Sequence, residues 1–407
     1  MGIINNVICG TCEWEIDEEK TLTIRPRNGK SGVLHKDCED DCWPWQSYSF
    51  IKKAVIAKGV STGRFAGGMF AGMKDCVEID VEWLDLSAAE NMCSMFAGCR
   101  SLTSVKGVEK WDVSKARCMS YMFLDCESLT DISPLTGWDV SRAVNMRSAF
   151  LGCKSLADIS ALAEWDVSEV AYMPGMFGDC RSLTDISPLR GWDVSGVVDM
   201  NHMFCECTHL TDISALAGWD ISKASNTSGM FEDCDSLKDI SPLETWDVSN
   251  VIYAHNMFAG CRQLADISPL SLWDMSSVRD ATEMFCNTGV SRDAYYALIP
   301  MTCPREGAFV GYKKCEGGRI VQLEVPEDAE RSSAYGKKCR CSKARVLHIW
   351  TPDGGEADYA VSGFDPDFIY RRGEIVEVED FDDYRFNECS TGIHFFMTRE
   401  EAANYIV

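Results

Sequence analysis

The sequence has little positive charge, and this shortage argues against two classes of partner. Its 407 residues carry 39 Lys and Arg against 63 Asp and Glu, which gives a formal net charge of −24. Nucleic acids and anionic lipid surfaces repel a protein of this sign rather than attract it. We therefore expect no nucleic-acid partner. Because an acidic surface also keeps a long repetitive protein dispersed, we expect a monomer.

The sequence also lacks long apolar runs. No stretch approaches the roughly 18 apolar residues that a membrane-spanning helix requires, so no membrane span is expected. Residues 1–10 show neither the basic region nor the apolar core of a signal peptide. We expect a cytoplasmic location for the chain as it stands, and a surface-exposed one if a leader peptide is missing.

Motifs of catalysis are missing as well. The sequence contains no nucleophile elbow, phosphate-binding loop, dinucleotide fingerprint or HExxH helix. Its six histidines leave few candidates for a general base. These absences favour a binding protein over an enzyme, and no cofactor is expected.

A 27-residue repeat dominates what the sequence does contain. The segment 128–141, Ser-Leu-Thr-Asp-Ile-Ser-Pro-Leu-Thr-Gly-Trp-Asp-Val-Ser, returns almost unchanged at 182–195. Three side chains recur at this step: Trp111, Trp138, Trp165, Trp192, Trp219, Trp246 and Trp273; Phe96, Phe123, Phe150, Phe177, Phe204, Phe231, Phe258 and Phe285; Cys99, Cys126, Cys153, Cys180, Cys207, Cys234 and Cys261. An earlier, shorter unit carries Phe70 and Trp83. One such unit cannot enclose a core, whereas about nine stacked coils can.

The repeat predicts a β-rich, leucine-rich-repeat-like solenoid, and we expect the segments that flank it to form an N-terminal β-hairpin cap and a small C-terminal α+β domain. Within a unit, Leu-Thr-Asp-Ile-Ser is the expected strand, with Leu129 and Ile132 inward and Asp131 outward. Trp-Asp-Val-Ser reads as a turn, and Met-x-x-Met-Phe as a short helical or 3₁₀ segment. After the last unit, Ser291 begins a short capping helix that Pro300 ends.

Four parts follow from the repeat and its limits. They are an N-terminal β leader or cap (1–62), the solenoid (63–290), a capping helix and linker (291–302) and the C-terminal domain (303–407).

Two signatures, Met-Phe-x-x-Cys-x-x-Leu and Trp-Asp-Val-Ser-x-Val, run over roughly residues 63–289, and a flank at 10–24 alternates like a hairpin. Together they resemble the BspA-like leucine-rich repeats of bacterial surface proteins and the β-hairpin leader that often precedes them. The resemblance implies a protein that binds and adheres to partners, and these partners vary widely. The sequence differs from the surface members of that family in that it shows no export signal.

The strand aspartates are the candidate binding residues of the solenoid. They should form an acidic stripe whose mutual repulsion a partner or a cation would relieve. The alternative is an ordinary solvated face on which each carboxylate bonds local backbone groups. The stripe comprises Asp131, Asp158, Asp185, Asp212, Asp239 and Asp266. A second aspartate column, from Asp112 to Asp274, is expected to cap turns.

The cysteines predict buried free thiols rather than disulfides or metal ligands. Stacked coils hold parallel Cβ atoms nearly 5 Å apart, whereas a disulfide requires about 3.8 Å. The exception is a weak zinc candidate near the N-terminus, formed by Cys9, Cys12, Cys38 and Cys42.

Beyond residue 300 the repeat ends. Segments 319–325, 344–350, 373–378 and 392–397 alternate like strands, and Thr398 begins a terminal helix with Glu401 three residues later. Segments 306–315, 331–341 and 387–396 resemble an uncharacterised domain that follows repeat arrays in bacterial and phage proteins.

This domain contains a second group of candidate binding residues. Basic residues close to two serines are suited to cradle a phosphate or carboxylate, although a solvated basic face that docks onto the acidic solenoid is an equal alternative. The group comprises Arg331, Ser332, Ser333, Lys337, Lys338, Arg340, Lys343, Glu388 and His394.

The interpretation that we favour is a non-enzymatic scaffold. Its solenoid recognises a protein or carbohydrate, and its C-terminal domain is a second recognition or effector module. The alternative is an effector enzyme with its chemistry in 303–407. The stretch from Gly392 to Tyr405 resembles the strand–helix element of ADP-ribosyltransferases, which place a catalytic Glu on a later strand, whereas this chain stops at Val407.

Overall fold

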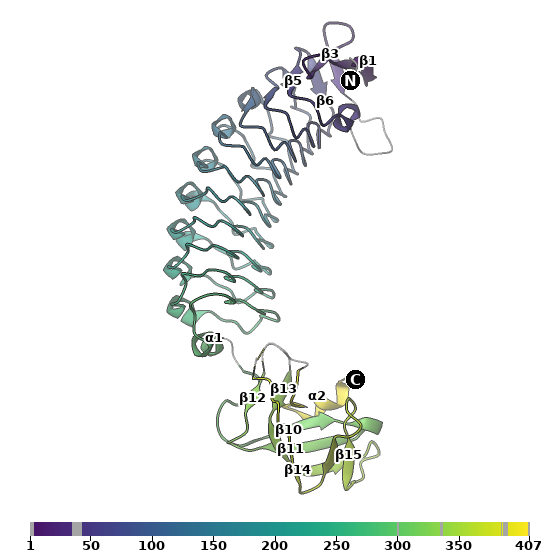
Figure 1. The fold of residues 1–407 in the computed structure, drawn as a ribbon, viewed down its shortest axis with the longest axis vertical. Coiled ribbons are helices and arrows are strands. Elements are labelled where there is room, and N and C mark those ends of the chain that lie inside the picture. Colours follow the sequence, from purple (N-terminus) through teal and green to yellow (C-terminus); the bar gives the residue numbers. More distant parts are fainter. Residues whose placement is uncertain are drawn as a thin grey trace. The chain divides into compact units, whose positions relative to one another are not determined.

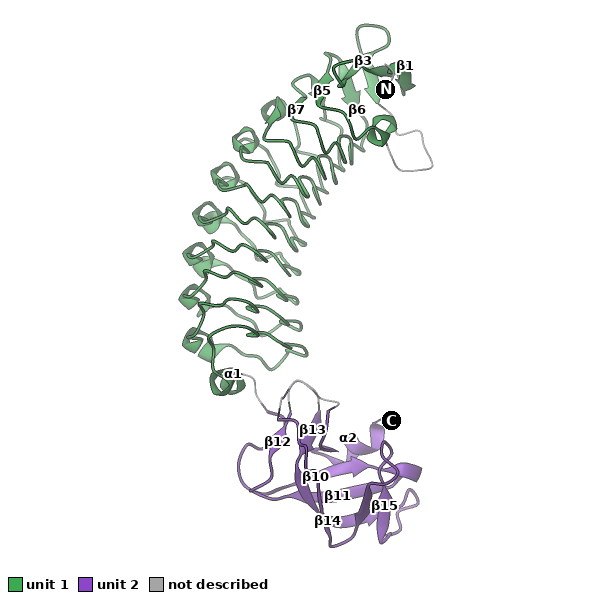
Figure 2. Cartoon of the chain, viewed as in Figure 1, with its two compact units in different colours: residues 1–298 green, residues 299–407 purple. Residues whose placement is uncertain are grey.

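The computed structural model describes residues 4–34, 43–298, 301–333, 337–383, 385 and 390–405. The chain divides into two compact units, residues 1–298 and 299–407 (Figure 2). Within the described residues, no helix combines the length and the apolar character needed to cross a membrane.

The first unit contains short strands at its N-terminal end, a series of 3₁₀ turns and one terminal helix. The strands are β1 (Ile4–Cys9), β2 (Cys12–Ile16), β3 (Thr21–Pro26), β4 (Gly32–Leu34), β5 (Lys53–Ile56), β6 (Val60–Thr62), β7 (Glu78–Asp80), β8 (Leu84–Asp85) and β9 (Val105–Lys106), and the helix is α1 (Arg292–Leu298). The 3₁₀ turns are η1 (Pro44–Ser47), η2 (Val108–Lys110), η3 (Ser133–Leu135), η4 (Ser160–Leu162), η5 (Ser187–Gly191), η6 (Ser214–Gly218), η7 (Ser241–Leu243) and η8 (Ser268–Leu272).

The expected β-hairpin cap is present at the N-terminus. Strands β1, β2 and β3 pair antiparallel, and β3 then pairs in parallel with β5, which begins the stack of coils. Trp14, Trp43 and Trp45 are buried beneath this cap, with Trp43 and Trp45 stacked 5.4 Å apart. The cap therefore covers the first coil with buried aromatic side chains, and the parallel coils continue from there.

The backbone ladder between coils lies in the Met-x-x-Met-Phe segment, which corrects the position expected for the strand. Met119, Tyr121 and Phe123 donate backbone N–H groups to carbonyls of the next coil at 2.7–2.9 Å. The expected strand segment instead runs into a 3₁₀ turn such as η3, and its only bridge among the described residues of the regular coils joins Asp185 to Asp212. Leu129 and Ile132 are buried, as expected.

The core consists of columns of identical side chains. Consecutive Phe rings from Phe70 to Phe285 stack with centroids 5.2–5.8 Å apart. The seven Trp indole N–H groups donate to backbone carbonyls of the preceding coil at 2.9–3.3 Å. The Cys thiols do the same at 3.1–3.3 Å. The Trp and Cys columns thus satisfy buried polar groups, and all three columns link neighbouring coils.

Trp83 does not belong to the Trp column. Its side chain is 47% exposed, with the amines of Lys58 and Lys110 lying over the indole ring at 5.2 and 5.5 Å. Leu84, which is buried and precedes Asp85 as Trp111 precedes Asp112, occupies the inward position of this short coil.

The stacked coils form a curved array with the 3₁₀ turns along its convex edge (Figure 1). Each regular coil also makes a sharp turn two residues after its Phe, where Gly152 has φ +77° and Asp125, Asp179, Glu206 and Asp233 also have positive φ. A Cβ on Gly152 would lie 2.5 Å from Oδ1 of Asp125 in the neighbouring coil. This position therefore accepts glycine or a short polar residue, and it places carboxylates side by side.

Helix α1 closes the last coil. Ser291 accepts the Ala294 N–H at the start of the helix, as expected, and Tyr295 donates its hydroxyl to the Ala281 carbonyl. The Tyr295 ring meets Phe285, the last ring of the Phe column, edge-on at 5.0 Å. Pro300, expected to end the helix, lies outside the described residues.

The second unit is a small α+β domain, as the sequence predicts. Its strands are β10 (Phe309–Lys314), β11 (Ile320–Val325), β12 (Arg331–Ser332), β13 (Lys338–Cys341), β14 (Lys343–Trp350), β15 (Tyr359–Val361), β16 (Ile369–Arg371), β17 (Ile375–Glu377) and β18 (Ile393–Phe396); η9 spans Glu316–Gly318 and α2 Arg399–Asn404. Seven strands form one sheet in the order β12-β13-β18-β10-β11-β14-β17, and β15 pairs with β16. Thr398 and Glu401 form the expected capping box.

Candidate functional site

The predicted aspartate stripe lies immediately before the 3₁₀ turns, which follow the convex edge in Figure 1. Each carboxylate accepts the backbone N–H of the residue two positions later at 2.7–2.9 Å. This hydrogen bond lowers the pKa of Asp158, Asp185, Asp239 and Asp266. The geometry is that of the local capping alternative, and partner binding by the stripe stays a prediction.

The second aspartate column caps turns, as expected. Asp112, Asp139, Asp166, Asp193, Asp220, Asp247 and Asp274 accept backbone N–H groups from the Trp-Asp-Val-Ser serines and from Ser276 at 2.9–3.1 Å. These carboxylates fix the local chain direction before the next ladder segment.

One further column, which sequence reasoning missed, starts the backbone ladder. Its members are Phe65, Asn91, Cys118, Asn145, Tyr172, Asp199, Asn226, Tyr253 and Asp280, each bridged to the next coil. Several of the Asn and Asp members accept the N–H two residues later, as Asn145 does from Arg147 at 3.0 Å. Tyr172 and Tyr253 instead leave their rings 47% exposed. The signal in the sequence was an aromatic residue at a position that elsewhere holds a turn-forming residue.

A groove of about 270 Å³ lies over the ladder segments of neighbouring coils. Pro174, Gly175 and Gly178 line it together with Arg147 and His202. A Cβ on Gly178 would lie 2.7 Å from the Leu151 side chain, so a larger residue there would force that side chain to move. We call this groove and the column from Phe65 to Asp280 the ladder face.

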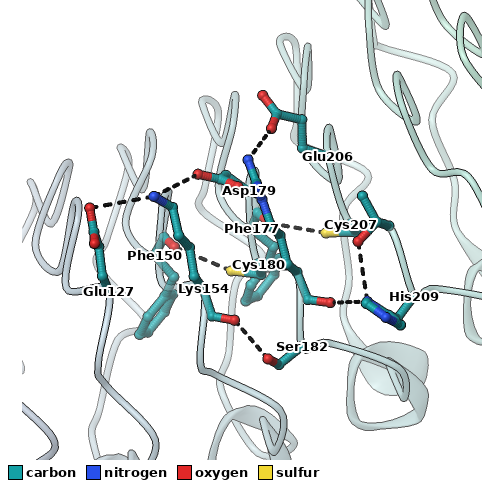
Figure 3. A network of polar contacts seen from close by, with 12 residues as sticks. Glu127, Phe150, Lys154, Phe177, Asp179, Cys180, Ser182, Glu206, Cys207 and His209 are labelled. Carbon is teal, nitrogen blue, oxygen red and sulfur yellow. Dashed lines mark hydrogen bonds and ion pairs between the residues drawn. The ribbon is translucent and has the colours of Figure 1, made fainter.

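Ion pairs run from coil to coil beside the groove (Figure 3). Lys154 bridges Glu127 at 3.4 Å and Asp179 at 3.8 Å, while Arg181 contacts Asp179 at 2.5 Å and Glu206 at 2.7 Å. Exposed pairs of this kind stabilise little individually, about 0–1 kcal/mol each. Their effect here is to hold carboxylates of successive coils in fixed positions.

The zinc candidate is placed only in part. Cys9 and Cys12 are buried at the ends of β1 and β2, and burial raises the pKa of Cys12 to about 11. Cys38 and Cys42 lie outside the described residues, within which no cluster of His, Cys, Asp or Glu is arranged to hold a metal. In the Cys column burial likewise raises the pKa, to about 12 for Cys126, as expected of inert buried thiols.

The candidate basic residues of the C-terminal unit do not all lie together in the structure. Arg331 donates to the carbonyls of Ala329, Pro304, Gly307, Pro326 and Glu327, so its guanidinium ties neighbouring loops together.

Arg340 and the two serines are equally internal. Arg340 is 1% exposed and donates to the Thr391 carbonyl at 2.9 Å and to Ser332 at 3.4 Å. Ser333 is also buried, and its hydroxyl accepts the Thr302 N–H at 3.0 Å. These three side chains belong to the interior, which departs from the cradle that the sequence predicted.

The remaining basic candidates separate. Lys337 pairs with Glu401 at 3.1 Å and Lys343 with Asp328 at 2.6 Å. Glu388 lies outside the described residues. Lys338 and His394, by contrast, lie diagonally on the neighbouring strands β13 and β18, where Lys338 pairs with Phe396 and Arg340 with His394 in the register.

Lys338 and His394 both line a pocket of about 670 Å³ in the C-terminal unit. Lys313 and Lys314 of β10 join them, together with aromatic side chains that include Tyr370 and Tyr405. These pocket residues come from separate strands, so their positions in the sequence could predict only some of them.

Comparison with solved structures finds bacterial repeat proteins. A leucine-rich repeat protein from Eubacterium ventriosum is 12% identical with a TM-score of 0.27, over 72% of this chain and 96% of that one. An internalin from Listeria monocytogenes is 12% identical with a TM-score of 0.20, over 69% and 78%. A leucine-rich cell surface protein from Faecalibacterium prausnitzii is 15% identical with a TM-score of 0.19, over 72% and 97%. Among curated proteins, none matches.

Two family descriptions match the chain, one for each unit. Residues 299–402 match a family of unknown function, DUF5758. Residues 66–186, 132–242 and 176–295 match the family described as Mycoplasma protein of unknown function, DUF285. These overlapping matches cover the whole coil array, and they confirm the repeat resemblance found in the sequence. The chain belongs to the DUF285 family of leucine-rich-repeat-like proteins and carries a DUF5758 domain at its C-terminal end.

Proposed function

We propose that the solenoid is a scaffold that binds a protein partner on its ladder face. The observation that carries the proposal is the pair of exposed tyrosines, Tyr172 and Tyr253, in a column otherwise occupied mainly by turn-forming Asn and Asp. Tyrosine is enriched in protein interfaces because a rigid ring contributes contact area and its hydroxyl can hydrogen-bond. Repeat arrays generally bind partners across such extended surfaces.

The spacing of the two tyrosines suits a single partner segment. They are three coils apart, which at about 4.8 Å per coil corresponds to roughly 14 Å. The groove of the ladder face is lined from Pro174 onward, two residues after Tyr172 in the chain. The chain has a net charge of −24, so the complementary partner surface is basic.

The test is quantitative affinity capture from a cell lysate with the full chain as bait. The Tyr172→Ser/Tyr253→Ser double variant should lose most of a specifically captured protein, and that protein, once purified, should bind the wild type but not the variant. Leu272→Ser is the matched control, because Leu272 is 79% exposed in η8 on the convex edge. Equal recovery by the wild type and the double variant would contradict the ladder-face proposal.

A carbohydrate partner is the second form of the same scaffold function, since exposed tyrosine rings also stack on sugar rings. A glycan array probed with the full chain and the same two variants separates the two forms. Glycan binding that the double variant loses, without any captured protein, would move the proposal to a carbohydrate.

A further inference from the structure

The pocket described above belongs to the C-terminal unit, whereas the ladder face belongs to the first unit, and the proposed scaffold function makes no use of the pocket. Its volume of about 670 Å³ is in the range that holds a small organic molecule. All of its described lining residues belong to the second unit.

The pocket contains the amine of Lys313, a partly buried cation. Burial lowers the pKa of the Lys313 amine, and the nearby charge of Lys338 acts in the same direction. The Lys313 amine makes one long hydrogen bond, 3.4 Å to the His394 carbonyl, and among the described residues no carboxylate forms an ion pair with it. A half-buried ammonium without an ion-pair partner is costly, so an anion placed beside it would stabilise the unit.

His394 adds a polar atom with no partner. Its Nε2 is buried and forms no hydrogen bond to any described protein group. Burial, together with the charges of Lys338, Lys313 and Arg340, lowers the pKa of this imidazole to about 3. Buried polar groups are nearly always hydrogen-bonded, so a ligand that supplies a partner for Nε2 would complete the site.

The walls of the pocket are aromatic. Phe368, Tyr370, Phe396 and Tyr405 contribute rings, and Phe364, which is 92% exposed, also belongs to the lining. Such walls favour an apolar or aromatic ligand body over a fully hydrated ion.

Two carboxylates limit how much negative charge the ligand can carry. Asp365 and Asp380 also line the pocket, against the three lysines Lys313, Lys314 and Lys338. Asp365 is engaged locally, because its carboxylate accepts the Asp367 N–H at 3.0 Å. Lys314 likewise donates to the carbonyls of Ala403 and Tyr405 behind helix α2. The balance suits one anionic group rather than a polyphosphate chain.

We propose that this pocket binds a small organic anion, with its single carboxylate or phosphate group between Lys313, Lys338 and His394 and an aromatic body against Phe368, Tyr370 and Phe396.

The experiment measures binding of defined probes to the full-length protein by isothermal titration calorimetry. Benzoate and phenyl phosphate supply the anionic group on an aromatic ring, benzyl alcohol is the neutral counterpart, and inorganic phosphate is the anion without a ring. Saturable binding of an aryl anion is expected, with benzyl alcohol and inorganic phosphate at least about tenfold weaker. Whether benzoate or phenyl phosphate binds more tightly identifies the anionic group.

Variants locate the site. Lys313→Gln and His394→Gln should each weaken the aryl anion about tenfold or more, whereas Lys343→Gln, on the same sheet but outside the pocket lining, should leave it unchanged. If Lys313→Gln does not fold, Lys338→Gln takes its place. NMR of the His394 imidazole gives a second readout, because a bound anion should shift its resonances. Equal binding of the neutral probe, no saturable binding of either aryl anion, or full binding by the pocket variants would overturn the proposal.

Discussion

Truncating Phe177 to alanine should destabilise the solenoid more than truncating Phe70, although both side chains are 0% exposed. Phe177 stacks between its two column neighbours at 5.8 Å each and lies 6.3 Å from Trp192. Phe70, at the start of the column, has one ring partner among the described residues, at 5.5 Å. The comparison therefore isolates ring stacking from burial.

The expected magnitudes follow from this difference. Removing a buried Phe side chain costs about 3–5 kcal/mol at either position. Phe177→Ala loses two more ring pairs, each contributing about 0.5–1.5 kcal/mol, so its loss should exceed that of Phe70→Ala by about 1–3 kcal/mol.

Hydrogen exchange on the full chain is the appropriate assay, because a long repeat array need not unfold in one step. The free energy of local opening should fall most in the coil of each substitution and in its two neighbours. Equal losses at Phe177 and Phe70 would show that stacking adds nothing beyond burial. Loss spread evenly over the whole array would refute the nearest-neighbour picture.

Three further predictions concern single groups. Trp192→Phe should cost about 0.5–1.5 kcal/mol because it removes the indole hydrogen bond to the Leu162 carbonyl, at 3.0 Å, although this carbonyl still accepts the Trp165 N–H; hydrogen exchange of the neighbouring coil measures the loss. Asp185→Ala should cost about 0.5–1.5 kcal/mol by removing the acceptor of the Ser187 N–H, whereas Asp185→Asn should retain most of the stability in the same exchange experiment. For His394, the pKa in the folded protein, about 3, lies below the ordinary value of 6.5, so the contribution of this residue to stability is complete above pH 6.5 and is lost as the pH falls toward 3. The free energy of unfolding of the C-terminal unit should therefore depend less on pH in the His394→Gln variant than in the wild type between these two values. The same pH dependence in both proteins would contradict a lowered pKa for His394.

The sequence predicted the columns of the solenoid because a fixed 27-residue step forces identical residues to stack. It did not predict where the backbone ladder lies. Apolar residues such as Leu129, Ile132 and Leu135 are spaced by three, and so are those of the ladder segment, including Met146 and Ala149. Side-chain periodicity therefore could not distinguish a 3₁₀ turn from a segment that donates to the next coil.

The C-terminal site was harder to predict, because its residues are distant in the sequence. Lys338 and His394 were among the expected binding residues, but Lys313 was not, and it lies on a third strand, β10. Lys338 and Arg340 lie two residues apart on β13 and therefore share a face of the strand, yet Lys338 lines the pocket whereas Arg340 is buried and donates to Ser332. Only the strand order, with β18 between β13 and β10, shows which of them meet.

The links between coils have a consequence for how the length of this protein can change during evolution. Indole, thiol and ladder hydrogen bonds reach only the adjacent coil, so no interaction of the array depends on the total number of coils. Segments 128–141 and 182–195 are nearly identical and lie two whole repeats apart, so one coil can stand in the place of another. Relatives can therefore gain or lose whole coils, moving the tyrosines closer together or further apart, while the hairpin cap and helix α1 continue to close the two ends unchanged.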